Sequence, residues 1–158
     1  MSIQVNELQT LLSIKTPSHV INDLNIQYHN NSNSNEIRFD LACALSKSKN
    51  KNDLYTAINH FKYFIDQRNQ YFRDSMYHLA LTYYILNEYD KTLIYCEEIY
   101  RQEPDNEQIK QLHLAAVYQH KQKTRDDSER DTAIAIAAGV GVAALAVGVT
   151  FLFGSRKK

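Results

Sequence analysis

The chain has 158 residues with 18 basic and 18 acidic side chains, enough for one compact domain with an appendage but not for two ordinary domains. Residues 1–155 carry 15 basic and 18 acidic side chains, a mildly acidic balance that is unsuited to binding nucleic acid. All 4 glycines lie between positions 139 and 154. The rest of the chain therefore holds no P-loop, no dinucleotide-binding loop and no G-x-S-x-G motif, which excludes nucleotide enzymes.

Helices are predicted along the body of the chain, because the tight turns that a sheet needs are poorly supplied with glycine and proline. Apolar spacing marks a short helix in an N-terminal arm, residues 1–16. Thr16 and Pro17 indicate the N-cap and first turn of a second helix. Asp105 with Gln108 resembles a capping box and predicts the start of the last helix.

An internal repeat fills the middle of the chain. Residues 76–104 match the tetratricopeptide pattern closely, and residues 39–69 repeat it more loosely. The packing positions of the second repeat are Met76, Leu79, Ala80, Tyr83, Thr92, Cys96 and Pro104. Those of the first repeat are Phe39, Ala42, Cys43, Ala57 and Phe61. The fold class predicted for residues 17–120 is an all-α, tetratricopeptide-like bundle of two repeats plus capping helices, about six helices in all.

The C-terminal part is predicted to cross a membrane. A charged linker, residues 121–132, leads into 21 uncharged residues at 133–153, which as a helix would match a hydrocarbon core of about 30 Å. A buried core helix is the alternative. The N-terminus lacks the features of a signal peptide, so we expect a single-pass, tail-anchored protein with its helical domain in the cytosol.

The character of the anchor indicates which membrane it enters. The segment 133–153 is rich in Ala and Gly and therefore only weakly hydrophobic, and a basic tail, residues 154–158, follows it. A weak span with a tail of this kind (Arg156, Lys157 and Lys158) is typical of outer mitochondrial and peroxisomal tail anchors. Small residues four apart in the span leave homo-oligomerisation open.

The layout resembles a known family. The stretch RDSMYHLALTYYILNEYDKTLIYCEEIYRQEPDN, residues 73–106, is similar to the second repeat of the mitochondrial fission 1 protein family, and FDLACALSKSKNKNDLYTAI, residues 39–58, is similar to its first. Three positions depart from the family's usual pattern: Cys43, Thr82 and Ile85. The resemblance implies an adaptor that recruits or regulates a dynamin-related GTPase, directly or through soluble adaptors, and so promotes division of mitochondria and of peroxisomes.

Paired helices of this type present a groove lined by the first helix of each repeat. We find the groove side by counting along each helix from its packing positions. The predicted groove residues are Ile37, Asp40, Ala44, Tyr77, Leu81 and Tyr84. The alternative is that they pack against residues 3–14, which are amphipathic, and in the resembled family an N-terminal arm can lie over this groove. Asp40, Ala44 and His78 occupy the places where related domains grip a carboxylate, so a chaperone-docking receptor is not expected.

No catalytic or metal site is expected, and no cofactor. The six histidines never form an H-x-x-x-H pair and are predicted to be exposed on helices: His19, His29, His60, His78, His113 and His120. Cys43 and Cys96 are predicted to be reduced core residues. The predicted function is therefore a tail-anchored fission adaptor. An import receptor for targeting peptides and a structural tether or oligomer are the alternatives.

Overall fold

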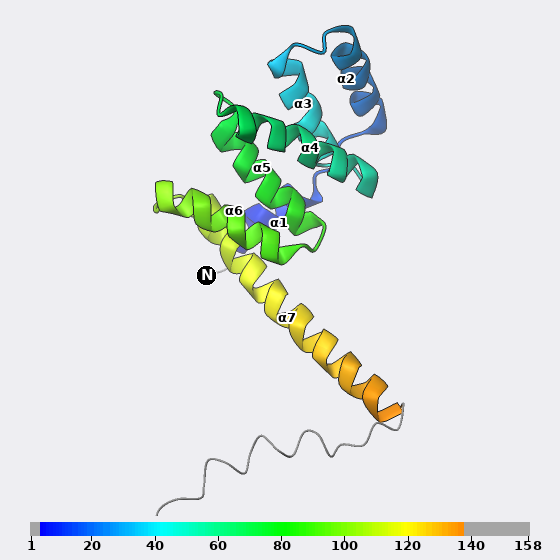
Figure 1. Ribbon diagram of the computed structural model, residues 1–158, viewed down its shortest axis with the longest axis vertical. Helices are drawn as coiled ribbons and strands as arrows, with labels where there is room; N and C mark the ends of the chain where they lie inside the picture. The colour runs from blue at the N-terminus through cyan, green and yellow to red at the C-terminus, as the bar shows by residue number, and fades with distance from the viewer. Residues whose placement is uncertain (1–3, 138–158) are drawn as a thin grey trace, which may run out of the picture. The chain divides into compact units, whose positions relative to one another are not determined.

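The computed structural model describes residues 4–137, which form seven helices and no strand in that range (Figure 1). The helices are α1 (Gln4–Ser13), α2 (Ser18–Asn30), α3 (Asn35–Leu45), α4 (Lys51–Gln67), α5 (Phe72–Ile85), α6 (Tyr89–Gln102) and α7 (Glu107–Ala137). The chain divides into two compact units, Met1–His120 and Lys121–Lys158, and α7 crosses the boundary between them. The all-α class is confirmed: α2 to α7, six helices, begin within residues 17–120, and α1 is the short helix predicted in the N-terminal arm.

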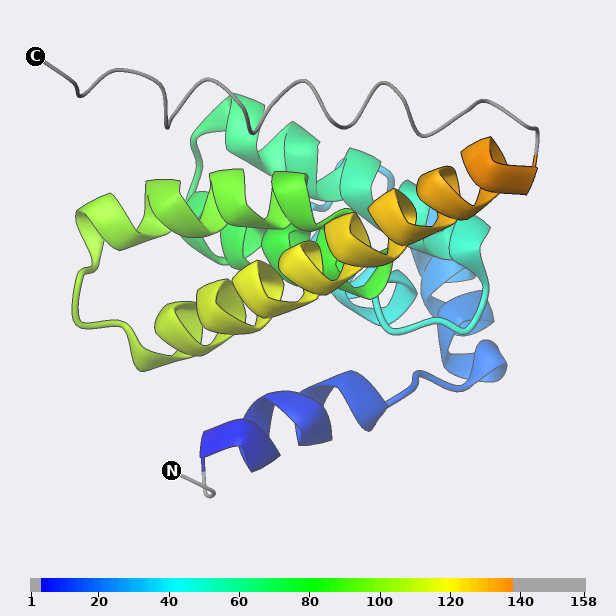
Figure 2. The ribbon, with the colours of Figure 1, turned by 90° about the horizontal axis from the view of Figure 1, so that it is seen from below.

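Successive helices of the first unit pack against one another, from α2 on α3 to α5 on α6 (Figures 1 and 2). The two repeats are the pairs α3–α4 and α5–α6, and α2 covers the free side of the first pair. This order of contacts is that of a short helical solenoid, in which each pair buries its apolar face against the next.

Polar residues mark the ends of these helices in place of glycine. The Ser34 hydroxyl accepts a hydrogen bond from the Ile37 backbone N–H at the start of α3, and the Asn50 side chain accepts one from Asn52 at the start of α4. After α5 the backbone turns through Asn87 with φ 60°, a left-handed conformation that Asn tolerates better than most residues. A chain without glycine before residue 139 can therefore still make short helical hairpins.

Two predicted helix starts are displaced by one residue. α2 begins at Ser18, and the residue at its cap is Pro17, whose backbone is extended; the Thr16 N–H instead donates to the Lys47 carbonyl at 3.1 Å. At α7 the cap is Asn106, whose side-chain oxygen accepts from the Ile109 N–H at 3.1 Å, and not Asp105. At α2 no side chain makes a capping hydrogen bond, so the capping preference of Thr16 did not apply. At α7 Asp105 and Asn106 are both good caps, and local sequence does not select between adjacent candidates.

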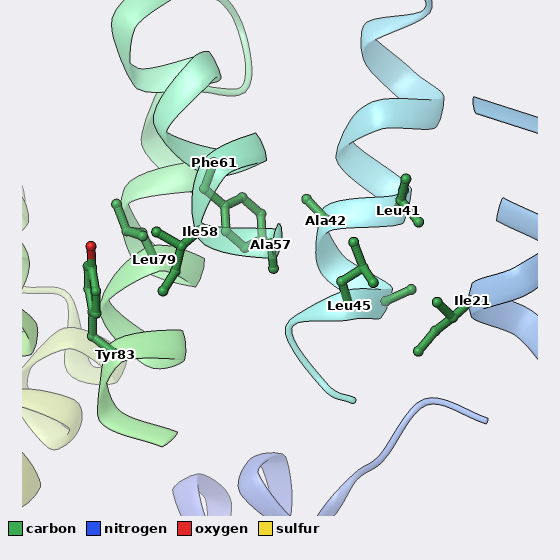
Figure 3. Packing of buried hydrophobic residues seen from close by; sticks show 10 residues of the cluster. Ile21, Leu41, Ala42, Leu45, Ala57, Ile58, Phe61, Leu79 and Tyr83 are labelled. Carbon is green, nitrogen blue, oxygen red and sulfur yellow. The ribbon is translucent and has the colours of Figure 1, made fainter. Parts of the chain in front are cut away.

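The first unit contains two apolar clusters that meet at α5. The first cluster joins α2, α3, α4 and α5 through side chains such as Ile21, Leu41, Phe61 and Leu79 (Figure 3). The second joins α1, α5, α6 and α7, and its fully buried members include Ile109 and Leu112. Because α5 contributes to both clusters, it is buried on opposite sides.

Most predicted packing positions are in the core. Nine of them are buried: Ala42, Ala57, Phe61, Met76, Leu79, Ala80, Tyr83, Thr92 and Cys96. Phe39 and Cys43 are partly buried against the first cluster. Pro104 is exposed, because it lies in the connection after α6 and ends that helix without packing against the next one.

Thr82 shows how α5 does without the glycine usual in the resembled family. Its side chain is fully buried, and its hydroxyl donates to the His78 carbonyl one turn earlier at 2.6 Å. The hydrogen bond compensates for the burial of the polar group, so the helix accommodates a hydroxyl at a close helix crossing.

The second part of α7 is described by itself. The segment 121–132, predicted to be a charged linker, is helical, and every residue from Lys123 to Ile134 is exposed. No helix within residues 4–137 is both long enough and apolar enough to cross a membrane. Residues 138–158, which include most of the predicted span and the basic tail, lie outside the described part of the chain.

Candidate partner-binding groove

The predicted groove residues lie on two helices. Three belong to α3 and are called here the α3 wall: Ile37, Asp40 and Ala44. Three belong to α5 and are called the α5 wall: Tyr77, Leu81 and Tyr84. Their spacing along each helix puts each set on one side of that helix.

The α5 wall is covered by the N-terminal helix. Leu81 is 6% exposed and belongs to the same apolar cluster as Leu8 of α1, which is 9% exposed. Leu12, Tyr77 and Tyr84 pack around this cluster and are half-buried. Residues of the chain's own arm therefore pack in one cluster with the α5 wall, which is the contact that the alternative interpretation expects for these three residues.

The α3 wall is less open than the pattern predicted. Ala44 is 8% exposed and belongs to the cluster that contains Ile21 of α2, so it serves the packing of the capping helix. Ile37 is half-buried, and Asp40 alone is exposed. Spacing along one helix could not distinguish a groove position from one covered by a neighbouring helix.

The two tyrosines of the α5 wall have shifted pKa values. Burial raises the pKa of Tyr77, and burial together with the neighbouring Tyr89 raises that of Tyr84. The rings of Tyr84 and Tyr89 meet edge to face with centroids 5.5 Å apart. Both phenols therefore remain neutral at physiological pH and offer apolar faces with one hydrogen-bonding group each.

The cysteines are free thiols with little reactivity. Cys96 is buried and Cys43 partly buried. Burial raises the pKa of each thiol to about 12. Because the thiolate is the nucleophile and the metal ligand, both behave as apolar packing residues at neutral pH.

The prediction that all histidines are exposed is wrong for four of the six. His19 and His29 are exposed, whereas His60, His78, His113 and His120 are partly buried. The signal missed was position: His78 lies one residue before the buried Leu79, on a helix that is buried on two sides. No group of His, Cys, Asp and Glu side chains within the described residues is arranged to hold a metal ion.

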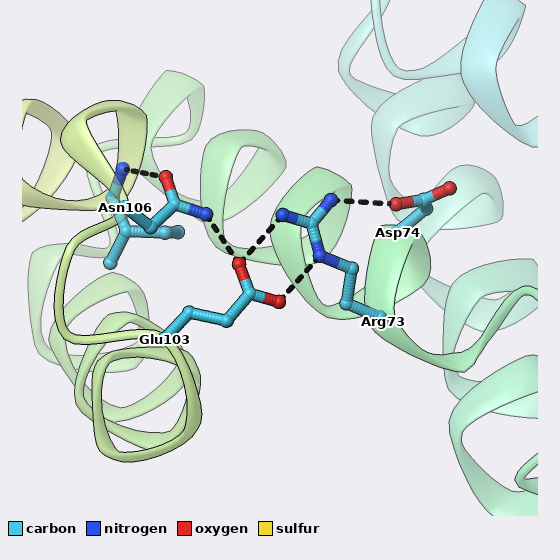
Figure 4. A network of polar contacts seen from close by, with 5 residues as sticks. Arg73, Asp74, Glu103 and Asn106 are labelled. Atoms are coloured by element: carbon cyan, nitrogen blue, oxygen red, sulfur yellow. Dashed lines mark hydrogen bonds and ion pairs between the residues drawn. The ribbon is translucent and has the colours of Figure 1, made fainter.

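Sequence reasoning also missed a polar network that fixes the start of α7 (Figure 4). Arg73 of α5 makes a two-pronged hydrogen bond to the Glu103 carboxylate, with both distances 2.7 Å. The Asn106 side chain donates to the same carboxylate at 2.7 Å while capping α7. The hydrogen bonds from Arg73 and Asn106 hold the pKa of Glu103 at about 2, so the network is intact throughout the physiological range.

Two hollows flank α6 and were not predicted. One, of about 550 Å³, lies among α4, α5 and α6 and is lined by Phe72 and Ile94 among others. The other, of about 590 Å³, lies between α6 and α7 beside Tyr100 and Leu114. None of the six predicted groove residues lines either hollow.

The repeat pairs and their two apolar clusters define a tetratricopeptide-like protein, a class whose fold serves protein interaction. Residues 73–121 match the family of the Fis1 C-terminal tetratricopeptide repeat. The match covers α5, α6 and the first part of α7, so this part of the chain is similar to the repeat of that family. No curated protein sequence matches significantly.

Solved structures of yeast Fis1 share the fold. The crystal structure of fission protein Fis1 from Saccharomyces cerevisiae has a TM-score of 0.67 and 19% identity, over 72% of this chain and 91% of that one. Yeast Fis1 in complex with an Mdv1 fragment containing N-terminal extension and coiled coil domains has the same TM-score and coverage at 20% identity. The solution structure of the yeast protein has a TM-score of 0.62 and 19% identity, over 74% of this chain and 83% of that one.

Proposed function

We propose that this chain is a tail-anchored adaptor of the outer mitochondrial membrane that recruits or regulates the dynamin-related fission machinery through its groove. The observation that carries the proposal is the apolar α5 wall, whose Leu81 lies in one cluster with Leu8 of α1, a helix outside the two repeats. The match of the second repeat to the Fis1 family supports the fission role.

The partner is a segment with apolar side chains that replaces or joins α1 on the α5 wall. Among the side chains of α1 that the structure describes, Leu8 and the partly buried Leu12 belong to the cluster, so we expect the repeats to stay packed when α1 leaves. An Mdv1 fragment binds yeast Fis1, which supports a soluble adaptor between this chain and a dynamin-related GTPase. The covered groove then acts as an autoinhibited site, open only when α1 moves.

The membrane anchor supplies local concentration. With residues 133–153 in the bilayer, the groove is confined to the organelle surface, and any partner it holds is concentrated there. The same anchor and the basic tail at Arg156, Lys157 and Lys158 suit the peroxisomal membrane as a second location. Self-association through the small residues of the span is a further proposal.

The test is the double substitution Tyr77→Ala and Tyr84→Ala, imaged with a fluorescent N-terminal fusion in cells that lack the natural protein. We expect the fusion on mitochondria but elongated networks, because the partner loses its two aromatic contacts while the buried Leu81 stays in place. Tyr118→Ala is the matched control, since Tyr118 is 61% exposed on α7 and belongs to neither apolar cluster.

The possible outcomes distinguish a fission adaptor from an import receptor and from a tether. Normal networks in the double variant with a defect in import of presequence-bearing proteins would favour the import receptor. Normal networks and normal import, with loss of function only when the span is altered, would favour the tether. Circular dichroism of the variant must match that of the unaltered protein for any of these conclusions.

A further inference from the structure

His78 occupies an unusual place between the two repeats. It belongs to α5 of the second repeat, and its ring stacks on Phe61 of α4 in the first repeat, with centroids 5.5 Å apart and planes 11° from parallel. The His78 ring also meets the Phe39 ring of α3 edge to face, with centroids 5.9 Å apart. One imidazole therefore touches both helices of the neighbouring repeat.

One of the two nitrogens of this ring lacks a hydrogen-bond partner. Its Nδ1 atom is buried and makes no hydrogen bond, one of two such side-chain atoms in the described residues. A neutral imidazole tolerates this position, because only one of its nitrogens carries a proton and the face of the ring is apolar. An imidazolium has two N–H groups, and the buried one would be left without an acceptor, which costs the full desolvation of a charged donor.

The charges around His78 do not compensate for this. Lys47, in the connection after α3, disfavours a positive charge on the ring, and Asp74 on α5 favours one. Asp74 is itself paired with Arg73 at 3.0 Å and is exposed. From α4, the group that faces the ring is the uncharged Phe61.

Other titratable groups lie close by on the packed elements. On α3, Asp40 is exposed, and the Cys43 thiol is held neutral by burial. On α5 the adjacent Tyr77 ring meets His78 edge to face at 5.6 Å. Burial is the largest cause that lowers the pKa of His78, which lies at about 4.

We propose that His78 is an acid-sensitive joint between the two repeats: when its ring takes up a proton, it leaves Phe61 and the packing of α5 on α3 and α4 weakens. The direction of the pH dependence follows from proton binding at His78 in the unfolded and in the folded chain. The unfolded chain binds a proton at His78 near the ordinary histidine pKa of about 6.5, whereas the folded chain resists it. Stability from this group is complete above pH 6.5 and is lost as the pH falls towards 4.

The joint lies next to the groove, since His78 and Tyr77 are adjacent and their rings are in contact. Acidification would thus loosen the repeat interface directly beneath the α5 wall. The joint itself does not depend on the proposed function, because its test needs neither a partner nor a membrane.

The first measurement is a ¹H–¹³C NMR titration of the histidine rings in the full chain, held in a zwitterionic detergent. We expect the His78 ring signal to keep its neutral chemical shift down to about pH 5, at least one pH unit below a histidine in a disordered peptide. Titration of His78 at about pH 6.5 would overturn the proposal.

The second measurement compares urea unfolding at several pH values between 7.5 and 4.5 for three proteins. The variant His78→Phe keeps an aromatic ring against Phe61 and cannot take up a proton, and His29→Gln removes an exposed histidine as the matched control. Below pH 6 we expect the folding equilibrium constant of the unaltered protein to fall about tenfold per pH unit faster than that of His78→Phe. His29→Gln should follow the unaltered protein.

Parallel pH profiles for the unaltered protein and His78→Phe would overturn the proposal. If His78→Phe does not fold, His78→Gln replaces it. This variant also lacks a titrating group, so the same flattening of the profile is expected from a lower starting stability.

Discussion

At the scale of single residues, the caps and the buried polar groups show what local sequence can and cannot specify. Ser34 and Asn50 cap their helices in the way their side chains favour. At the start of α7, Asp105 and Asn106 are both competent caps, and the structure uses Asn106 because its amide also reaches the Glu103 carboxylate (Figure 4). The second hydrogen bond decides between two neighbours that local propensity ranks equally.

This choice predicts unequal effects for two adjacent alanine substitutions. Asn106→Ala removes the cap of α7 and one hydrogen bond to Glu103, and we expect it to lower the free energy of unfolding by about 1–2 kcal/mol. Asp105→Ala, at an exposed position without a capping role, should change it by less than about 0.5 kcal/mol. Urea unfolding of both variants decides, and a larger loss for Asp105→Ala would assign the cap to Asp105.

At the scale of elements, α5 and α1 differ in how strongly they are held. α5 is buried on both sides, with Leu79 and Tyr83 in one cluster and Met76 in the other. α1 is held through few side chains, of which Leu8 is the buried one within the described side chains. A helix held by few apolar side chains opens at a lower free energy than repeats held by many, so we expect α1 to open before α3–α6.

The weak hold on α1 can be tested by placing a charge in its contact. Leu8→Asp puts a carboxylate into the apolar cluster with Leu81, so we expect α1 to leave the groove while α3–α6 stay folded. Hydrogen exchange followed by mass spectrometry should show at least tenfold faster exchange in residues 4–13 and unchanged exchange in α5. Gln9→Asp is the matched control at an exposed neighbour. Equal protection of residues 4–13 in both variants would mean that α1 is held by other contacts.

At the scale of the whole molecule, the sequence joins a folded unit to a charged helix and an apolar end. The first unit ends at His120, and α7 continues through a segment with four basic and four acidic side chains between residues 121 and 131. A helix with balanced charges and no apolar stripe has no face to bury, which suits a spacer that stays in water. The proposed attachment to a membrane rests on the 21 uncharged residues that follow.

Deletion of residues 133–158 tests that attachment. We expect the shortened protein to move from the membrane fraction to the soluble fraction and to lose its effect on organelle shape, because the loss of the apolar segment removes the free energy of insertion. The control changes only Arg156, Lys157 and Lys158 to glutamine, which keeps the protein in membranes but shifts some of it to the endoplasmic reticulum. A shortened protein that still restores organelle division would contradict the role of the anchor.

Much of the fold could be predicted because its signals are local. The repeat positions that share a helix face, such as Met76 and Ala80 in α5, are apolar or small at regular spacing, and their burial follows from that spacing. The groove was only partly predictable. Spacing placed Leu81 and Ala44 on exposed faces, but α1 covers one and α2 belongs to the cluster that buries the other.

What the sequence by itself determined is therefore the helical class, the two repeats and the uncharged C-terminal segment, since each depends on periodicity or composition within a short window. Only the tertiary structure decided which helix faces stay exposed and which buried polar atoms lack a hydrogen-bond partner. The ring of His78 stacks on Phe61, 17 residues earlier, and Leu8 packs in one cluster with Leu81, 73 residues later. Such contacts depend on how separate helices cross, which no periodicity within one helix encodes.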